Sequence, residues 1–212
     1  MINSAASNEK LDELFARYAA GQLSMPMHVL VSAHLAIRQE SRNYVSCLES
    51  LGAQAIESCT PVPLSDRDGC LKSIFSSREA PVVRTPAQTF MPEPLHKFLG
   101  MDLADIKWRR RMPGLKEYTI FKQDGIEANL YLIKAGHGIP SHTHEGGECT
   151  LVLKGSFYDK IGRYSKGDIA IADSELDHHP IVDKDEDCLC YAVIDAPLHL
   201  TGPFGRIIDR FM

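Results

Sequence analysis

The 212-residue sequence predicts an α+β protein in which a small N-terminal helical bundle is joined by a linker to a C-terminal antiparallel β-sandwich or barrel. Three observations carry this prediction. Apolar residues in the first part recur with the period of an α-helix. Residues 79–94 contain four prolines and no period, as linkers do. Short apolar runs separated by turns then follow, as in antiparallel sheets. We therefore expect a helical domain at residues 1–80, a proline-rich linker at 81–94 and a β-domain at 95–212.

The first predicted helix carries one apolar stripe, and Gly21 follows it as a residue that ends helices well. The stripe consists of Leu11, Leu14, Phe15 and Tyr18. The second helix is expected to begin after Ser24, a favourable N-cap, with Pro26 in its first turn. Its buried stripe contains Val29, Leu30, Ala33, His34 and Ile37.

Two further helices are expected before the linker. The third, near residues 40–57, should bury Tyr44, Cys47, Leu48 and Leu51. The fourth, near residues 65–77, has Ser65 or Asp66 as its cap. Its buried face should contain Leu71, Ile74 and Phe75.

The C-terminal part should begin with a short helix near residues 95–100 and continue as strands. The strands are expected at residues 117–121, 127–133, 149–155, 167–172 and 187–194. Short strands at this spacing favour an antiparallel sandwich or barrel.

The segment GHGIPSHTHEGGECTLVLKG, residues 136–155, places His142, His144 and Glu148 at a metal-ligand spacing. Side chains at i and i+2 of a strand share one face, so the two imidazoles can aim at one point. Two neutral imidazoles and a carboxylate suit Zn, Fe, Mn or Ni better than Ca or Mg. A second segment, GDIAIADSELDHHP at residues 167–180, ends in His178 and His179. Neighbouring strand residues face opposite ways, so only one of these two histidines should reach a metal.

These two segments resemble the two motifs of the cupin family. The first matches the family pattern at every spacing from Gly136 to Gly155, and the second places His178 eleven residues after Gly167. Asp173 and Glu175 replace the proline and glycine usual in the second motif. The resemblance implies a double-stranded β-helix, or jelly-roll barrel, with His179 as an outward neighbour of the metal site. It implies four ligands to one divalent transition metal: His142, His144, Glu148 and His178.

Zinc is the first expectation for this metal, and iron, manganese or nickel are the alternatives. Scattered surface histidines are the other interpretation of the pattern, which the matching spacing in two separate segments disfavours.

Composition restricts the partners and the compartment. The net charge of -5 gives no footprint for nucleic acid, and we interpret the basic stretch at residues 107–111 as a solvated strand end or loop. The first residues have no apolar signal core, and no stretch approaches the ~20 apolar residues of a membrane span, so we expect a cytoplasmic protein without a membrane partner.

In the reducing cytoplasm the six cysteines should be free thiols. Cys188 and Cys190 would share a strand face, as two small buried hydrophobes or as an oxidant-sensing pair near the metal.

A helical module, a linker and a cupin in this order resemble the ChrR-type anti-sigma factors over almost the whole chain. The resemblance rests on residues 18–24, 31–35, 142–157, 167–180 and 187–198. It implies that the helical domain sequesters an extracytoplasmic-function sigma factor and that the cupin is needed for release under singlet-oxygen or organic-peroxide stress. We expect the docking face to include Leu14, Phe15 and Tyr18, or else Leu71, Ile74 and Phe75.

The helical domain departs from the family at one place. Members bind zinc there through His-x3-Cys-x2-Cys and an upstream histidine. This sequence keeps His34 but has Arg38 and Ser41 at the cysteine positions, with Glu9 near the place of the missing histidine. A closed tetrahedral zinc site cannot be built from these residues. We therefore expect this domain to fold without zinc, with His34 in its core and His28 on its surface.

Two other functions also fit the sequence. The first is a cupin metalloenzyme of the dioxygenase or isomerase type acting on a small molecule, for which Tyr131, Tyr158 and Asp195 are candidates by residue type alone. Barrel-core and turn roles explain these three residues better, so no catalytic residue is assigned. The second is a cupin that binds a small ligand and forms a homodimer.

Overall fold

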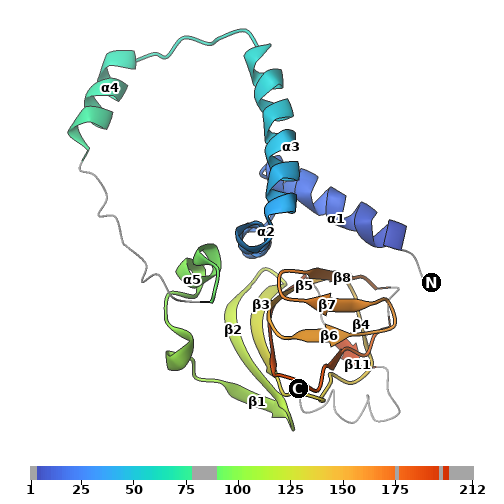
Figure 1. Cartoon of the computed structure of the whole chain (residues 1–212). Helices are drawn as coiled ribbons and strands as arrows, with labels where there is room; N and C mark the ends of the chain where they lie inside the picture. The colour runs from blue at the N-terminus through green and yellow to red at the C-terminus, as the bar shows by residue number, and fades with distance from the viewer. Residues whose placement is uncertain (1–3, 78–89, 175–176, 196–197, 201–212) are drawn as a thin grey trace.

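The computed structural model describes residues 4–77, 90–174, 177–195 and 198–200 (Figure 1). Four helices precede a β-barrel, and a fifth short helix lies beside α2. The predicted fold class is confirmed. The helices are α1 (Ser4–Ala19), α2 (Met25–Ile37), α3 (Gln39–Glu57), α4 (Arg67–Ser76) and α5 (Glu93–Leu99).

Helix ends follow the expected local chemistry. Gly21 after α1 has φ 67°, a left-handed conformation that glycine adopts without a Cβ clash. Ser24 is the N-cap of α2, although its side chain makes no capping hydrogen bond. Asp66 caps α4, and its carboxylate accepts a hydrogen bond from the Gly69 backbone N–H at 2.9 Å. Gly100, with φ 73°, ends α5.

The barrel is made of three antiparallel sheets. The largest has the order β1-β2-β3-β10-β5-β8, and the smaller ones are β11-β4 and β7-β6-β9. The main-sheet strands are β1 (Arg109–Met112), β2 (Leu115–Gln123), β3 (Ile126–Ile133), β5 (Glu148–Lys154), β8 (Ile169–Ala172) and β10 (Cys188–Ile194). The others are β4 (His142–His144), β6 (Ser156–Tyr158), β7 (Arg163–Ser165), β9 (Ile181–Val182) and β11 (Leu198–Leu200). All five predicted strands are present.

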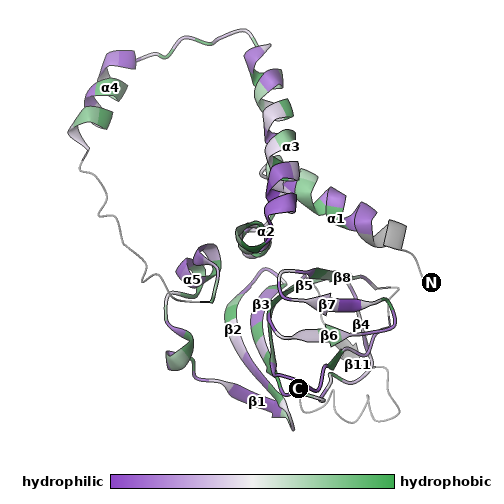
Figure 2. Cartoon of the chain, in the orientation of Figure 1, coloured by the Kyte–Doolittle hydropathy of each residue, from purple (hydrophilic) through white to green (hydrophobic). Residues whose placement is uncertain are grey.

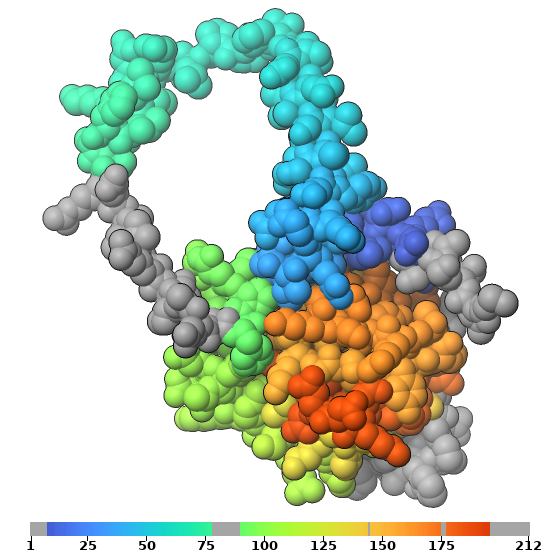
Figure 3. All heavy atoms as spheres, in the orientation of Figure 1, coloured from blue at the N-terminus to red at the C-terminus, as the bar shows by residue number. Residues whose placement is uncertain are grey.

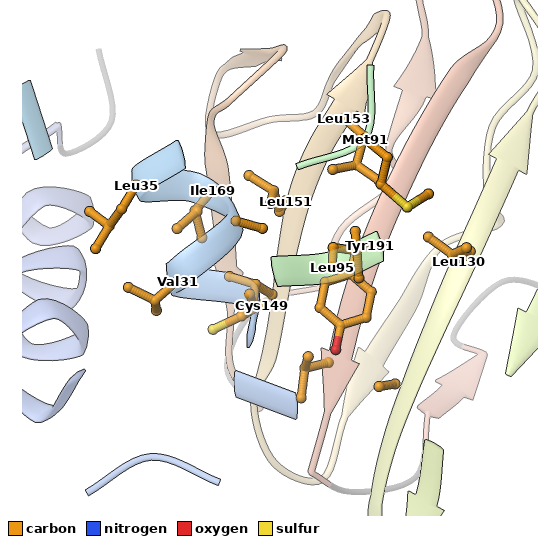
Figure 4. Packing of buried hydrophobic residues seen from close by; sticks show 14 of the residues in the cluster. Val31, Leu35, Met91, Leu95, Leu130, Cys149, Leu151, Leu153, Ile169 and Tyr191 are labelled. Carbon is orange, nitrogen blue, oxygen red and sulfur yellow. The ribbon is translucent and has the colours of Figure 1, made fainter. Parts of the chain in front are cut away.

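Alternation along the central strand β10 divides the barrel wall into two faces. Tyr191 and Val193 point outward into a core shared with the helices, whereas Cys188 and Cys190 point into the barrel. The outward core is closed by Val31 and other residues of α2 and by α5, as Figure 4 shows. The helical part and the barrel thus bury one common apolar core.

Polar contacts also join the helices to the barrel. The Tyr191 hydroxyl donates to the Pro26 carbonyl at 3.1 Å, and His34 Nδ1 donates to the Gly167 carbonyl at 2.7 Å. Arg38 donates to the Lys166 carbonyl at 2.9 Å and to Asp168 Oδ1 at 2.6 Å. Gly167 has φ 90°, a backbone conformation that favours glycine, and a Cβ there would lie 2.7 Å from the Arg38 Nε.

The outer helices bury less than their periodicity predicts. In α3 the only buried residue is Val45, whereas Tyr44, Cys47 and Leu51 are exposed and Leu48 is half-buried. The predicted buried face of this helix is therefore wrong.

Helix α4 shows the same difference, since it has no buried residue. Ile74 and Phe75 are exposed, and Leu71 is half-buried. The outer part of α3 and all of α4 stand away from the barrel in the space-filling view (Figure 3), so the described part of the chain offers them no partner surface.

The predicted linker falls mostly on residues 78–89, which lie outside the described residues. The boundaries at residues 80 and 94 therefore stay a prediction. Met91, near the end of this stretch, is buried against the barrel (Figure 4). None of the described helices combines the length and the apolar character that a membrane crossing needs.

Candidate metal centre

Three predicted ligands meet inside the barrel. His142 lies on β4, Glu148 begins β5, and His178 forms an isolated backbone bridge with His142. One ligand atom from each lies within 4.8 Å of the others. The two Nε2 atoms face each other at 2.8 Å, and His142 Nε2 is 3.9 Å from Glu148 Oε2. Within the described part of the chain, this is the one group of three such residues that could hold a metal.

Contacts behind two of these ligands orient their side chains. His142 Nδ1 donates to the Pro140 carbonyl at 2.7 Å, which keeps the proton on Nδ1 and leaves the Nε2 lone pair for a metal. The Thr150 hydroxyl donates to Glu148 Oε1 at 2.6 Å and fixes that carboxylate. Two imidazole nitrogens and an oriented carboxylate fit a transition metal such as zinc.

A further acid, Asp159, lies behind His178. Its Oδ2 is 3.7 Å from His178 Nδ1, and its Oδ1 accepts from the backbone N–H groups of Ile161 at 2.8 Å and Gly162 at 3.1 Å. Burial alone would raise the pKa of Asp159, but the neighbouring His178 imidazole and the hydrogen bonds from these backbone groups hold that pKa below its ordinary value. No sequence motif marks this residue.

The structure locates the other predicted site residues less fully. His144 lies on β4 and pairs with Leu198, but its side chain is outside the described residues. His179 is exposed, with Nδ1 donating to the Ile139 carbonyl at 2.6 Å, and is the outward neighbour as predicted.

The cavity beside the triad is small. Its volume is about 30 Å³, enough for an ion and a few water-sized ligands. Tyr131 and Cys190 line it, and burial raises the pKa of the Tyr131 hydroxyl above its usual range. Tyr158 and Asp195, the other candidates by residue type, are exposed and are not among its lining residues. Asp195 instead accepts from the Gly147 backbone N–H at 2.5 Å.

Two cysteines lie close to the site. Cys188 and Cys190 are buried on one face of β10, as predicted, with their Sγ atoms 3.5 Å apart. The contact with Cys188 and burial together raise the pKa of Cys190. Neither cysteine forms a disulfide in this structure, and Cys190 borders the cavity.

Residues 34 and 38, at positions where the resemblance implies zinc ligands, make other contacts here. His34 is buried as predicted, with its ring stacked on Phe15 at 5.4 Å between centroids. Burial lowers its pKa. Arg38 binds the barrel at Asp168, as described above. His28 is exposed, as predicted, and stacks on Tyr18.

The fold and the site together define a cupin that carries an N-terminal helical module. A family profile described as the ChrR cupin-like domain matches residues 96–196. The anti-sigma-E factor ChrR of Cereibacter sphaeroides is 35% identical over 206 residues, which cover 94% of this chain and 95% of that protein. The chain therefore belongs to the ChrR family of anti-sigma factors.

A solved structure agrees with this assignment. In the crystal structure of Rhodobacter sphaeroides SigE in complex with the anti-sigma ChrR, the matched chain is 36% identical to this one. The match covers 87% of this chain and 96% of that chain, with a TM-score of 0.74. The similarity thus includes both the helices and the barrel.

Proposed function

We propose that this chain is a cytoplasmic anti-sigma factor whose helices sequester an extracytoplasmic-function sigma factor. Its metal-bearing cupin senses oxidative stress, from singlet oxygen or peroxide, and promotes release. The observation that carries this proposal is the similarity along nearly the whole chain to ChrR, which is named as an anti-sigma factor and was crystallised with SigE.

The sigma factor would dock on what we call the α3–α4 arm, residues 51–76. Apolar side chains of the arm are exposed, as Phe75 at 82% and Val62 at 87% illustrate. Hydrophobic residues recur along this arm in Figure 2. Covering one such side chain contributes ~1.5–3 kcal/mol, so a partner that buries several of them gains substantial binding energy. The large exposed members are Leu51, Ile56, Val62, Leu64, Ile74 and Phe75.

The other predicted docking face is not accessible. Leu14 and Phe15 are 7% and 3% exposed because they pack in the core shared with the barrel. Tyr18 is half-buried and exchanges a hydrogen bond with Ser32 at 3.1 Å. Docking on these residues would require the helices to leave the barrel, so the arm is the docking face that we propose.

Strand β8 offers a route from the metal site to the helices. Its Ala172 pairs with the ligand Glu148 and lines the cavity, while Ile169 packs in the core under the helices. Asp168, just before the strand, holds Arg38 of the segment between α2 and α3. We propose that oxidation at Cys188 or Cys190, or a change at the metal, shifts β8 and so alters how the helices pack on the barrel.

A metalloenzyme remains the second candidate, because Glu148, His178 and Tyr131 line one cavity. Ordinary small-molecule sites span roughly 300–1,000 Å³, whereas this cavity is about 30 Å³. A substrate would therefore need the barrel to open. The helical module also has no evident role in an enzyme, and this favours the regulatory function.

Co-expression of the full chain with each extracytoplasmic-function sigma factor of its own genome tests the proposal. One sigma factor should co-purify in a stable complex. Ile74→Asp with Phe75→Asp should weaken that complex at least tenfold, because about 1.4 kcal/mol already corresponds to tenfold. Ser73→Asp is the matched control, since it adds charge to the same exposed helix without removing apolar surface. If no sigma factor binds and the metal-loaded protein turns over a small carbonyl or thiol substrate, the enzyme is the answer.

A further inference from the structure

We propose that Asp159 is a positioning residue of the metal site, which orients His178 and selects the tautomer that can bind the metal. This inference rests on the proposed metal site in the barrel. Asp159 lies outside both cupin motifs, directly after β6. Its side chain is only 2% exposed, although a carboxylate is costly to bury without partners.

The carboxylate of Asp159 is fixed by its own turn. Oδ1 accepts from the backbone N–H groups of Ile161 and Gly162, and the Asp159 backbone N–H donates to the Gly162 carbonyl at 2.9 Å. The turn between β6 and β7 thus directs Oδ2 into the barrel. Oδ2 lies 3.7 Å from His178 Nδ1, within ion-pair distance and without the close approach of a short hydrogen bond.

A carboxylate at this place favours a proton on the facing nitrogen of an imidazole. With Nδ1 protonated, His178 has its lone pair on Nε2, 2.8 Å from His142 Nε2, and the two nitrogens are placed to bind one shared metal ion. His142 is held in the same tautomer by the Pro140 carbonyl. In both ligands an oxygen atom therefore faces Nδ1 and favours the proton there, which leaves Nε2 as the nitrogen that can bind a metal.

The backbone around His178 does not determine the tautomer of its ring. His178 belongs to no strand and is tied to β4 by two hydrogen bonds, from its N–H to the His142 carbonyl at 3.1 Å and from the His142 N–H to its carbonyl at 3.2 Å. These bonds fix where the residue sits but not which ring nitrogen carries the proton. That choice falls to the group that faces Nδ1.

Asp159→Asn tests the inference with little change of shape. In this variant the backbone N–H groups of Ile161 and Gly162 still donate to the side-chain amide oxygen. The NH2 group of the asparagine must therefore face His178 Nδ1. Two donors then oppose each other, which favours the tautomer with Nε2–H and blocks the metal. We expect the variant to bind zinc 10- to 100-fold more weakly than wild type, the usual effect of losing such a partner, in competition with a chromophoric chelator.

Asp183→Asn is the matched control. Asp183 accepts from Ser156 and Arg163 beside the same three-stranded sheet but contacts none of the three ligands described above. Zinc affinity should be unchanged in this variant. Equal zinc affinity of Asp159→Asn and wild type would overturn the positioning role while leaving the metal site intact. Absence of zinc binding in wild type would overturn the metal site itself.

A spectroscopic measurement on the wild-type protein decides the question even if the variant fails to fold. Long-range ¹H–¹⁵N spectra of the zinc-loaded full chain distinguish the two imidazole tautomers. His178 should show a protonated Nδ1 and a metal-bound Nε2. A His178 ring with its proton on Nε2 would refute the inference, and a merely structural role for Asp159 would not specify either tautomer.

Discussion

Replacing Leu30 by alanine tests whether the helices and the barrel fold as one unit. Leu30 on α2 is 0% exposed and belongs to the same core cluster as Leu95 and Tyr191. Removing a fully buried leucine side chain costs ~2–5 kcal/mol. For a protein of this length, 1 kcal/mol shifts Tm by about 2–4 °C. A loss of about 3 kcal/mol should therefore lower Tm by about 6–12 °C in one cooperative transition.

Scanning calorimetry measures Tm, and two optical probes follow the two parts of the chain during the same thermal unfolding. The single tryptophan, Trp108, packs partly buried against the shared core and reports the barrel, while far-UV circular dichroism reports the helices. Both probes should shift together in Leu30→Ala. The control Leu51→Ala, at a residue 62% exposed, should cost no more than about 0.5 kcal/mol. If Trp108 fluorescence keeps the wild-type Tm while the helical signal melts earlier, the common core does not couple the two parts.

Three further predictions concern the metal, pH and the chain between the two parts. His142→Ala combined with His144→Ala should abolish binding of one metal per chain in elemental analysis, and a fragment of residues 1–85 should carry no stoichiometric zinc. Metal affinity should also fall as pH falls through the histidine range, because a ligating imidazole must be neutral. Burial lowers the pKa of His34 from its ordinary 6.5, so the unfolded chain binds that proton first. The contribution of His34 to the free energy of unfolding is therefore complete above pH 6.5 and is lost as pH falls below 6.5. Urea midpoints measured between about pH 7 and 5 should decline less in His34→Gln than in wild type. Limited proteolysis should cut within residues 79–94 and leave two stable pieces, which should remain associated until denaturant separates their shared core; one resistant product spanning that stretch would contradict this.

The barrel strands could be predicted because each carries a local signal. In β10, alternate residues such as Tyr191 and Cys190 face opposite sides, and that period survives in the sequence. The short strands β6, β7 and β9 could not be predicted, because three residues or fewer hold too little pattern to separate a strand from a turn.

The burial of the helices could be predicted only in part. An apolar stripe indicates that a face is covered but not what covers it. In α1 the predicted stripe residues Leu14 and Phe15 are buried, and the barrel helps to cover them. In α4 a similar stripe with Ile74 and Phe75 is exposed, because no described element lies against it.

The metal site, like the helices, could be predicted from the sequence only in part. His142, Glu148 and His178 could be predicted because two sequence motifs fix their spacing, and the structure brings them together. Asp159 could not, since it lies nineteen residues before His178 and reaches it only through the pairing of β6 with β9. The contact of Arg38 with Asp168 joins distant segments in the same way, without a local signal.

Inhibition of sigma-dependent transcription is the direct test of sequestration by this chain. RNA polymerase core enzyme, the extracytoplasmic-function sigma factor that co-purifies with the chain and its promoter DNA would be combined in a run-off assay, with the full-length protein added in increasing amounts. An anti-sigma factor should abolish the sigma-dependent transcript at about one chain per sigma factor, while transcription by the housekeeping sigma factor continues. A transcript that persists at about tenfold excess of the metal-loaded, folded protein would contradict sequestration of the sigma factor.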